Sequence, residues 1–312
     1  MSLRVLAGGA LSLLQDSGRR GSHHLGMTLG GALDGEAYHY CNRLLQNPPD
    51  SSVIEISLGG LQLQAEVDTW FCVTGASMPL TIDGTEHALW RVHQLKAGQS
   101  VALGYAQDGS RSYLGVAEGF DIPHYFGSAS TVIREGTGGL NGKPLAKGDS
   151  LPCPEVAQRR RLSLPRQYRP RYQRQATLRV IPGYQQHLFS REQQRQFFAF
   201  PYRVSERSDR MGYRLEGNPV HCDVDGVLSE GICLGAIQVP PDGQPIVLLN
   251  DHQTIGGYPK IGSALITDAW RLAQLNAGHS VHFAPITPAG ARRALRNTHR
   301  FALNHPLQEL TT

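Results

Sequence analysis

Short β-prone runs constrain the fold of this chain more than any other feature of its sequence. Between residues 53 and 116 the runs recur about every ten residues, a spacing typical of all-β folds. They are VIEISL, LQLQAEV, TWFCVTG, LTID, ALWRVHQL, SVALGY and RSYLGV. Pairs such as Asp83-Gly84 and Asp108-Gly109 separate runs, and Asp-Gly between extended segments favours a β-hairpin. The pattern predicts an antiparallel sandwich or barrel rather than alternating strands and helices.

A few short helices are predicted among the strands. Asp34 stands where a helix N-cap is expected, ahead of an apolar stripe that runs from Ala37 to Leu45. Ser190 begins a capping-box pattern for a helix reaching Phe198. A terminal helix is predicted from Pro288 to about residue 303, with proline in its first turn.

A further hairpin precedes the most polar stretch of the second half. Two apolar runs, Gly231–Val239 and Pro245–Asn250, flank the turn sequence PPDG at 240–243. Directly after the second run come Asp251, His252, Gln253, Thr254, Gly256, Gly257, Tyr258 and Lys260. Paired glycines let the backbone approach a ligand closely. An ordinary surface loop explains these residue types equally well, because loops are polar in general.

Cysteine content and hydropathy bear on the class of protein. Hydrophobic residues make up 40% of the 312 residues, enough for a sizeable core. No apolar stretch reaches the length of a membrane span, so no transmembrane segment is expected. The start lacks a secretory cleavage pattern, so no secretory signal is expected either. Five scattered cysteines without a C-x-x-C pair favour a reduced, cytoplasmic environment over a disulfide framework. They also lack the spacing of a zinc site, so no metal is expected.

The positive charge is concentrated in one short run. The chain has a formal net charge of +4, and seven arginines lie between residues 159 and 174, so the remaining residues carry −3. No stacking aromatics or nucleic-acid motif accompany the run, which therefore predicts a solvated linker rather than a nucleic-acid interface. The predicted division is a first β-barrel subdomain at 1–155, an Arg/Pro-rich connector at 156–176 and a second at 177–312.

A short internal similarity links the two halves. Residues 95–101 (LKAGQSV) and 275–281 (LNAGHSV) agree at five of seven positions, and in each case a polar turn leads into a predicted strand. So short a match indicates two related units only weakly, and coincidence remains an alternative.

Several enzyme classes lack their motifs here. The sequence contains no G-x-x-x-x-G-K-[ST] phosphate loop, no dinucleotide fingerprint and no G-x-S-x-G elbow. With these motifs absent, the residues favour a site that consists of fixed hydrogen-bond donors and one or two carboxylates. Such a site suits a small carboxylate or amide substrate whose carbonyl oxygen gains charge during the reaction.

Several long motifs, in order along nearly the whole chain, resemble one family. They are LLQDSGRRGSHHLGMTLGGALDGEAYHYCNRLLQN near the start, EISLGG, FDIPHYFGSAST, GGLNGKPLAKGD, SDRMGYRLEG and GAIQVPPDGQPIVLLNDHQTIGGYPKIG. They are similar to the biotin-dependent carboxyltransferase-like family, which holds the C subunits of 5-oxoprolinases, Kip inhibitor antagonists and the carboxyltransferase part of urea carboxylase. The resemblance implies a mainly β fold with two antiparallel cyclophilin-like β-barrel subdomains.

The resemblance also implies a site in the polar stretch. By motif position the catalytic candidates are Asp251, Gln253, Tyr258 and Lys260, and the substrate-binding candidates are Arg210, Tyr213, Thr254, Gly256 and Gly257. Lys260 or Arg210 would hold an anionic group, Asp251 would orient a group or accept a proton, and the glycine N–H groups would face an oxyanion. As alternatives, Arg210 pairs with an acid of the barrel and Tyr258 is a core residue.

The function that the resemblance implies first is a subunit of an ATP-dependent 5-oxoprolinase, which opens the lactam of 5-oxoproline to glutamate. The expected partners are the two other 5-oxoprolinase subunits, one of the LamB/YcsF type and one of the Kip inhibitor type, with ATP as a substrate of the complex. The alternatives are a biotin-dependent carboxyltransferase component and a regulator without enzymatic activity that binds a Kip inhibitor type partner. No residue of the sequence is assigned to ATP.

Overall fold

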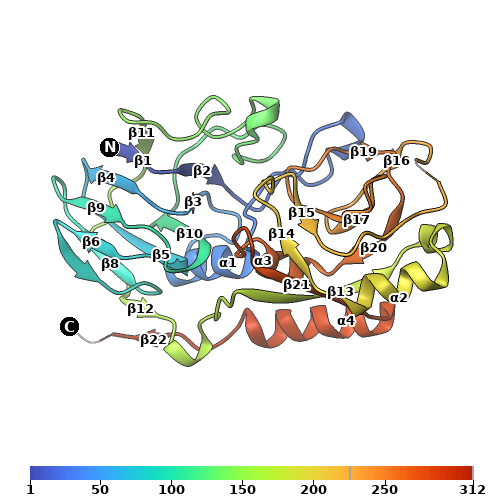
Figure 1. Ribbon diagram of the computed structural model, residues 1–312. Coiled ribbons are helices and arrows are strands. Elements are labelled where there is room, and N and C mark those ends of the chain that lie inside the picture. Colours follow the sequence, from blue (N-terminus) through green and yellow to red (C-terminus); the bar gives the residue numbers. More distant parts are fainter. Residues whose placement is uncertain (225, 311–312) are drawn as a thin grey trace. The chain divides into compact units, whose positions relative to one another are not determined.

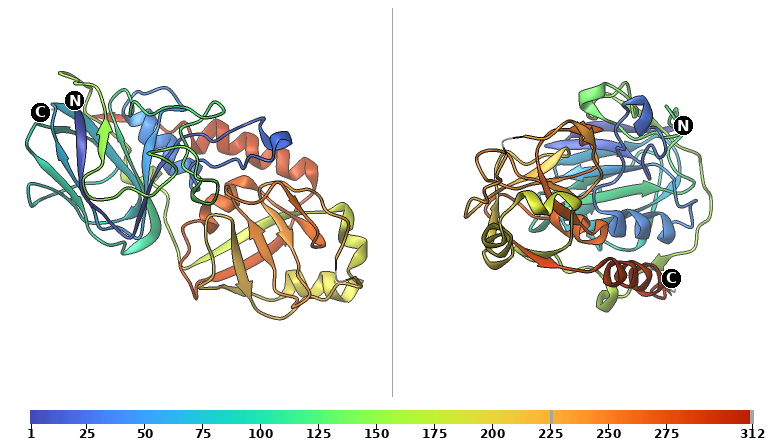
Figure 2. Two further views of the ribbon diagram at one scale, coloured as in Figure 1. Left: turned by 90° about the horizontal axis from the view of Figure 1, so that it is seen from above. Right: turned by 90° about the vertical axis from the view of Figure 1, so that its right-hand side faces the viewer.

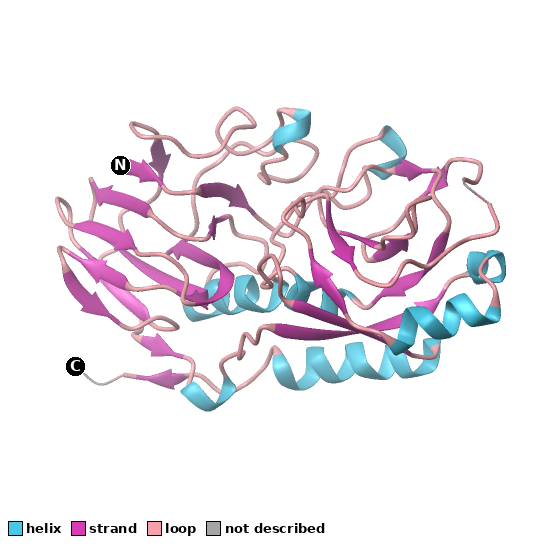
Figure 3. Cartoon of the chain, in the orientation of Figure 1, coloured by secondary structure: helices cyan, strands magenta, loops and turns pink. Residues whose placement is uncertain are grey.

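Strands make up most of the regular structure in the computed structural model, which describes residues 1–224 and 226–310 (Figure 3). Within those residues there are four short α-helices, so the prediction of a mainly β fold with a few short helices is confirmed. The chain forms two units. The first comprises Met1–Arg20, Gly30–Tyr172 and the residues from Phe301 onward, and the second comprises Gly21–Leu29 and Gln173–Arg300.

The first unit contains two large antiparallel sheets (Figure 1). A six-stranded sheet has the order β11-β1-β4-β9-β6-β7, from β1 (Ser2–Gly8), β4 (Leu61–Ala65), β6 (Leu80–Ile82), β7 (Thr85–His87), β9 (Ser100–Leu103) and β11 (Ser150–Pro152). A five-stranded sheet has the order β2-β3-β10-β5-β8, from β2 (Leu11–Gln15), β3 (Val53–Ser57), β5 (Thr69–Ser77), β8 (Val92–Leu95) and β10 (Asp108–Val116). Each of the predicted runs between residues 53 and 116 therefore contains a strand.

The two predicted Asp-Gly turns have different outcomes. Asp83 and Gly84 form the two-residue loop between β6 and β7, and both have positive φ, 48° and 80°, as a type I′ hairpin turn requires. Asp108 and Gly109 instead open strand β10, so a turn there was a wrong prediction. The pairing of β10 with β5 shifts register between Asp108 and Ser112, which indicates a bulge in place of the turn.

Two apolar clusters hold the first unit together. One lies between the sheets and joins residues such as Leu63 and Val101 to Ile54, Phe71 and Leu114. The other packs helix α1 (Gly35–Leu44) against the five-stranded sheet through Ala37, Tyr40, Cys41 and Leu44. The apolar stripe seen in the sequence is thus the buried face of α1.

Asp34 caps α1 as predicted, and we expect its loss to be costly. A carboxylate oxygen accepts from the N–H groups of Glu36 and Ala37, both at 3.1 Å, and the other oxygen accepts from the Tyr172 hydroxyl at 2.8 Å. Asp34→Ala should lower the free energy of unfolding by about 1–2 kcal/mol, because it leaves helix donors and a buried phenol without their acceptor. Urea unfolding measures this, and a loss below a few tenths would contradict the cap.

The Arg/Pro-rich connector is more ordered than the sequence suggests. Leu162 and Leu164 enter the cluster beneath α1, and β12 (Leu162–Ser163) pairs with β22 (Gln308–Glu309). The Arg161 guanidinium lies 5.7 Å from the Trp70 ring centroid, and Arg160 pairs with Glu309 at 2.7 Å. The prediction of a solvated linker was therefore wrong over this part, because leucines between the arginines anchor it to the core.

A closed barrel forms the second unit, and Figure 2 shows it from two further directions in yellow to red. Its order is β13-β20-β17-β18-β15-β14-β21, from β13 (Gln175–Pro182), β14 (Tyr202–Val204), β15 (Gly212–Glu216), β17 (Ala236–Gln238), β18 (Ile246–Leu248), β20 (Lys260–Ala264) and β21 (Ser280–Pro285). The barrel is antiparallel except where β13 runs parallel to β21. A separate ribbon pairs β16 (Glu230–Gly231) with β19 (Ile255–Gly256).

Three helices accompany the barrel. They are α2 (Arg191–Ala199), α3 (Ile266–Leu272) and α4 (Pro288–Asn297), which continues into a π-helical turn at Thr298–Ala302. Ser190 caps α2 through the Gln193 N–H, as predicted. The Phe197 ring of α2 stacks on Phe283 of β21 with centroids 4.3 Å apart, which fixes the helix to the barrel core. The predicted terminal helix is confirmed by α4.

The predicted hairpin at 231–250 is confirmed. Strands β17 and β18 pair antiparallel, and Gly243 closes the intervening turn with positive φ, 74°, and a bond from its N–H to the Pro240 carbonyl at 2.9 Å. On its other edge β17 pairs with β20, with a register shift between Ile237 and Gln238. This places Lys260, the first residue of β20, opposite Gln238.

The internal similarity corresponds to one turn geometry used twice. Gly98 and Gly278 have φ of 88° and 80°. In the first copy the Lys96 N–H donates to the Gln99 side chain at 2.9 Å, and in the second the Asn276 N–H meets His279 Nδ1 at 3.2 Å. The residues shared by 95–101 and 275–281 therefore form the same turn, which precedes β9 in the first unit and β21 in the second.

Candidate functional site

Lys260 and Glu230 form the centre of a polar cluster in the second unit. Lys260 Nζ lies 2.6 Å from Glu230 Oε1, and the two side chains are 11% and 34% exposed. The short distance makes this an ion pair, but Nζ lacks a hydrogen bond of acceptable geometry within the described residues. The ammonium is therefore neutralised by one carboxylate while it keeps N–H donors for another group.

Two neighbouring residues of the 3₁₀ turn Tyr184–Leu188 hold the carboxylate from the other side. The Tyr184 hydroxyl donates to Glu230 Oε2, and Gln185 Nε2 donates to Oε1 at 2.9 Å. Gln185 Oε1 in turn accepts from the backbone N–H of Lys260 at 2.9 Å. The glutamine thus ties the strand that carries Lys260 to the carboxylate that neutralises it.

These contacts fix the charge states of the cluster. The neighbouring Lys260 ammonium first, and then the Tyr184 hydroxyl, lower the pKa of Glu230 below its ordinary value. The contact with Glu230 raises the pKa of Tyr184, because ionising the phenol beside a carboxylate is unfavourable. Near neutral pH Glu230 is therefore a carboxylate and Tyr184 is a neutral phenol.

The lowered pKa of Glu230 gives a pH dependence with a definite sign. Above the ordinary glutamate pKa of about 4.5 the carboxylate is ionised in both folded and unfolded chains, so its stabilising contribution is fully present. The contribution disappears as the pH falls through the lower pKa of the folded state. In a carboxyl-carbon NMR titration, Tyr184→Phe should move the midpoint of Glu230 upward. An unchanged midpoint would contradict the role of the phenol.

Gly256 brings two amide side chains to the cluster. A Cβ on Gly256 would lie 2.7 Å from Gln238 Nε2 and 3.7 Å from Gln253 Nε2. Gly256 is paired with Glu230 in the β16–β19 ribbon. Gln238 is 2% exposed, and its Nε2 is a buried donor without a hydrogen bond in the described residues. A side chain at position 256 would therefore displace the Gln238 amide group.

Arg210 and Asp251 form a second pair of charged residues. Arg210 Nε and Nη2 donate to the two oxygens of Asp251, both at 2.9 Å, and both side chains are buried. The Asp251 N–H also bonds to the Arg210 carbonyl at 3.0 Å. The Arg210 guanidinium, which was expected to hold an anionic group, thus binds both oxygens of an aspartate of the second unit, which is the alternative raised for Arg210.

The four remaining predicted residues differ in burial and in their bonding partners. The Tyr213 hydroxyl is buried and lies 3.3 and 3.2 Å from the carbonyl oxygens of Ala273 and Leu275. Tyr258 is 43% exposed rather than part of the core. The carbonyl of Thr254 accepts from Ile232, and that of Gly257 accepts from Val227. A Cβ on Gly257 would lie 3.0 Å from the Val227 oxygen, so its close neighbour is the chain itself.

The structure therefore brings Lys260, Gln253 and Gly256 together, and it pairs Arg210 with Asp251. Sequence reasoning missed Glu230, Tyr184, Gln185 and Gln238. Glu230 offered one signal, because it is the only acidic residue between 226 and 241. Tyr184 and Gln185 offered none, since their partner lies 46 and 45 residues away.

None of the helices described has the length and apolar character needed to cross a membrane. Residues 1–224 and 226–310 contain no group of three or more His, Cys, Asp or Glu side chains placed to hold a metal ion.

Residues 25–285 match the family model described as carboxyltransferase domain, subdomain A and B. The chain is 38% identical over 302 residues to the C subunit of 5-oxoprolinase from Escherichia coli K12, with 96% of each chain covered. It is 36% identical to the C subunit of 5-oxoprolinase from Haemophilus influenzae, with 91% of each covered.

The structure is also similar to larger solved proteins. The urea carboxylase of Kluyveromyces lactis superposes on 99% of this chain with a TM-score of 0.90 and 26% identity. The chain spans 30% of that protein and 20% of the K. lactis urea amidolyase, which gives the same TM-score and identity.

Proposed function

Since this chain belongs to the family of the carboxyltransferase domain with subdomains A and B, we propose that it is the C subunit of a 5-oxoprolinase. The complex would open the lactam of 5-oxoproline to glutamate while hydrolysing ATP. One observation carries the proposal. The match to a protein named as the C subunit of 5-oxoprolinase covers 96% of both chains at 38% identity, so it extends over nearly the full length of each.

The same proposal includes the partners. The chain would work with an A-type partner of the LamB/YcsF kind and a B-type partner of the Kip inhibitor kind and would be inactive alone. The word subunit in the names of both relatives supports dependence on other chains. Five free cysteine thiols support a reduced, cytoplasmic setting. ATP would be a substrate of the whole complex.

The Lys260 cluster suits the carbonyl chemistry of a lactam. The reaction places negative charge on the lactam oxygen, and preorganised donors stabilise such charge better than reorganising water does. The Lys260 ammonium would donate to that oxygen, and the Glu230 carboxylate and Gln185 would hold the ammonium in place. Gln238 Nε2, a buried donor beside Gly256, would supply a further N–H. Gln253 would line the same side.

The proposal is tested by glutamate release from 5-oxoproline and ATP, measured with the LamB/YcsF-type and Kip-inhibitor-type partners in the presence and absence of this chain. We expect release that depends on all three proteins and on ATP. Release of equal rate without this chain would overturn the proposal.

A second candidate is a carboxyltransferase component that works with a separate biotin carrier. The TM-score of 0.90 against urea carboxylase over 99% of this chain favours it. Lower identity, 26% against 38%, places it behind the first. Carboxyl transfer from a carboxylated biotin carrier protein to urea, measured with this chain, would distinguish the two.

A further inference from the structure

A pocket of about 730 Å³ is lined only by residues of the first unit. None of the residues of the Lys260 cluster lines it. Its wall includes Arg166, Arg169, Arg171 and Tyr172 of the connector, together with Trp90 and segments around Glu86 and Asp108. The volume falls in the range of about 300–1,000 Å³ that is typical of sites for small organic ligands.

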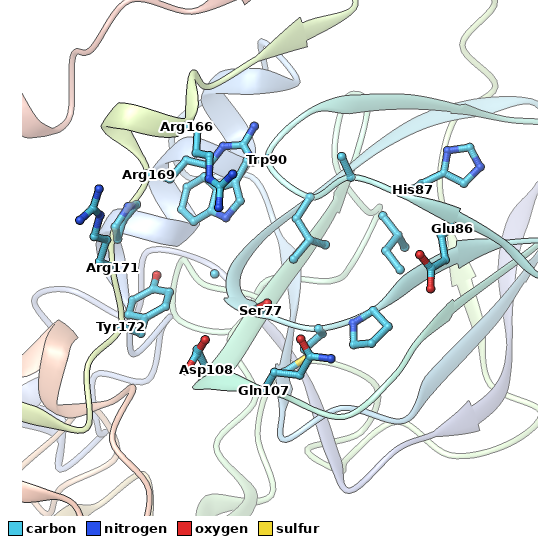
Figure 4. Close-up of a pocket in the computed structure, with 17 residues that line it drawn as sticks. Ser77, Glu86, His87, Trp90, Gln107, Asp108, Arg166, Arg169, Arg171 and Tyr172 are labelled. Atoms are coloured by element: carbon cyan, nitrogen blue, oxygen red, sulfur yellow. The ribbon is translucent and has the colours of Figure 1, made fainter.

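Three guanidinium groups gather on one side of this pocket. Figure 4 shows Arg166, Arg169 and Arg171 with Tyr172 and Trp90 on one side and Glu86 and His87 on the other. Three other connector arginines, at 159, 160 and 161, contact Glu118, Glu309 and the Trp70 ring respectively. Within the described residues no ion pair links the three pocket arginines to a carboxylate.

Arg169 shows the electrostatic consequence of this arrangement. It is half-buried, and its Nε donates to the Leu164 carbonyl at 2.8 Å, which fixes the side chain. Burial, followed by the neighbouring Arg166 and Arg91, lowers the pKa of its guanidinium. A bound anion would relieve the repulsion between these cations, so the pocket is electrostatically complementary to negative charge.

The wall behind the arginines is rigid. Tyr172 donates from its hydroxyl to Asp34, the cap of α1, at 2.8 Å. Trp90 has a positive φ of 64°, a costly conformation for a bulky residue, and the bonds from its N–H to Val73 and from Leu164 to its carbonyl maintain it. Such preorganisation reduces the entropy that a ligand loses on binding.

We propose that this pocket binds a nucleoside polyphosphate. The three guanidiniums would contact phosphate oxygens, which they match in geometry as well as charge. Glu86 and Asp108 on the rest of the wall would accept hydrogen bonds from amino and hydroxyl groups, which a nucleoside offers and a free polyphosphate does not. The choice of ATP as the nucleotide rests on the proposed function, whereas the phosphate-binding character rests on the arginines alone.

Calorimetric titration of the full chain with ATP, inorganic triphosphate and adenosine tests the proposal. The test variant is the double change Arg166→Gln with Arg171→Gln, since both side chains are exposed and their loss spares the fold. The control is Arg292→Gln with Arg296→Gln on α4, which removes the same charge from another exposed surface. We expect Kd for ATP to rise at least about tenfold in the test variant and to stay unchanged in the control.

Comparing the three ligands distinguishes the contribution of the arginine side of the pocket from that of the Glu86 side. Triphosphate should compete with ATP, and Glu86→Gln should weaken ATP without affecting triphosphate. Absence of ATP binding by the unmodified chain, or equal weakening in the test and control variants, would overturn the proposal.

A kinetic measurement separates this inference from the proposed function. In the reconstituted complex the test variant should raise KM for ATP and leave KM for 5-oxoproline unchanged. Glutamate release without ATP binding at the pocket would refute the pocket alone, and ATP binding without glutamate release would refute the function alone.

Discussion

Asp251→Ala should lower the free energy of unfolding by about 3–5 kcal/mol, the cost of leaving the Arg210 guanidinium buried without its carboxylate. Arg210 Nε and Nη2 each bond to Asp251 at 2.9 Å, and the two side chains are only 7% and 8% exposed. Urea unfolding of the full chain gives the measurement. The double variant Arg210→Met with Asp251→Leu should lose less than Asp251→Ala, because it removes both buried charges together.

A surface pair supplies the control for this expectation. Glu309→Gln breaks the pair with Arg160, in which both side chains are more than half exposed, 57% and 53%, and should leave stability nearly unchanged. If Asp251→Ala were as stable as the original chain, the pair would not hold this part of the barrel. If Asp251→Ala loses activity, the stability of the variant must be measured before the loss is attributed to a catalytic role of Asp251.

Lys260→Met should reduce kcat for glutamate release by about a hundredfold to a thousandfold, the effect of removing one donor to a developing oxyanion. Methionine fills the space of the buried lysine stem, so the chain should still assemble with its partners. The matched control is Lys96→Met, which breaks a pair with Asp68 at 2.9 Å whose lysine side chain is 55% exposed. This control should keep full activity.

Glu230→Gln separates positioning from direct contact at Lys260. The amide keeps an acceptor for Gln185 and Tyr184 but no longer neutralises the ammonium, so kcat should fall less than in Lys260→Met. Unchanged kcat in Lys260→Met, in a complex shown to be assembled, would reduce Lys260 to a structural partner of Glu230.

Features encoded by adjacent residues could be read from the sequence. The α1 cap at Asp34, the α2 cap at Ser190 and the type I′ turn at Asp83 each depend on residues within three positions of one another. Their physics is local, since one side chain bonds to a nearby backbone group or one φ is left-handed. The family resemblance then fixed the fold class.

The chemistry of the site depends on contacts across the sequence, which the pattern alone could not provide. Arg210 and Asp251 were both singled out, but their mutual bond joins residues 41 positions apart. The Lys260 cluster assembles from the 3₁₀ turn at 184–188, the ribbon strand that carries Glu230 and the start of β20. The connector was misjudged for a similar reason, since its composition is that of a linker while two leucines determine its packing.

The way the chain alternates between its units limits how it can be divided. Residues 21–29 belong to the second unit, and strand β22 belongs to the first unit although it follows the barrel in sequence. A gene split at the connector would therefore yield one polypeptide without its closing strand and another without its His23 loop, which meets His252 with ring centroids 5.6 Å apart. Fission or domain shuffling at that point would produce fragments that must associate to complete each other.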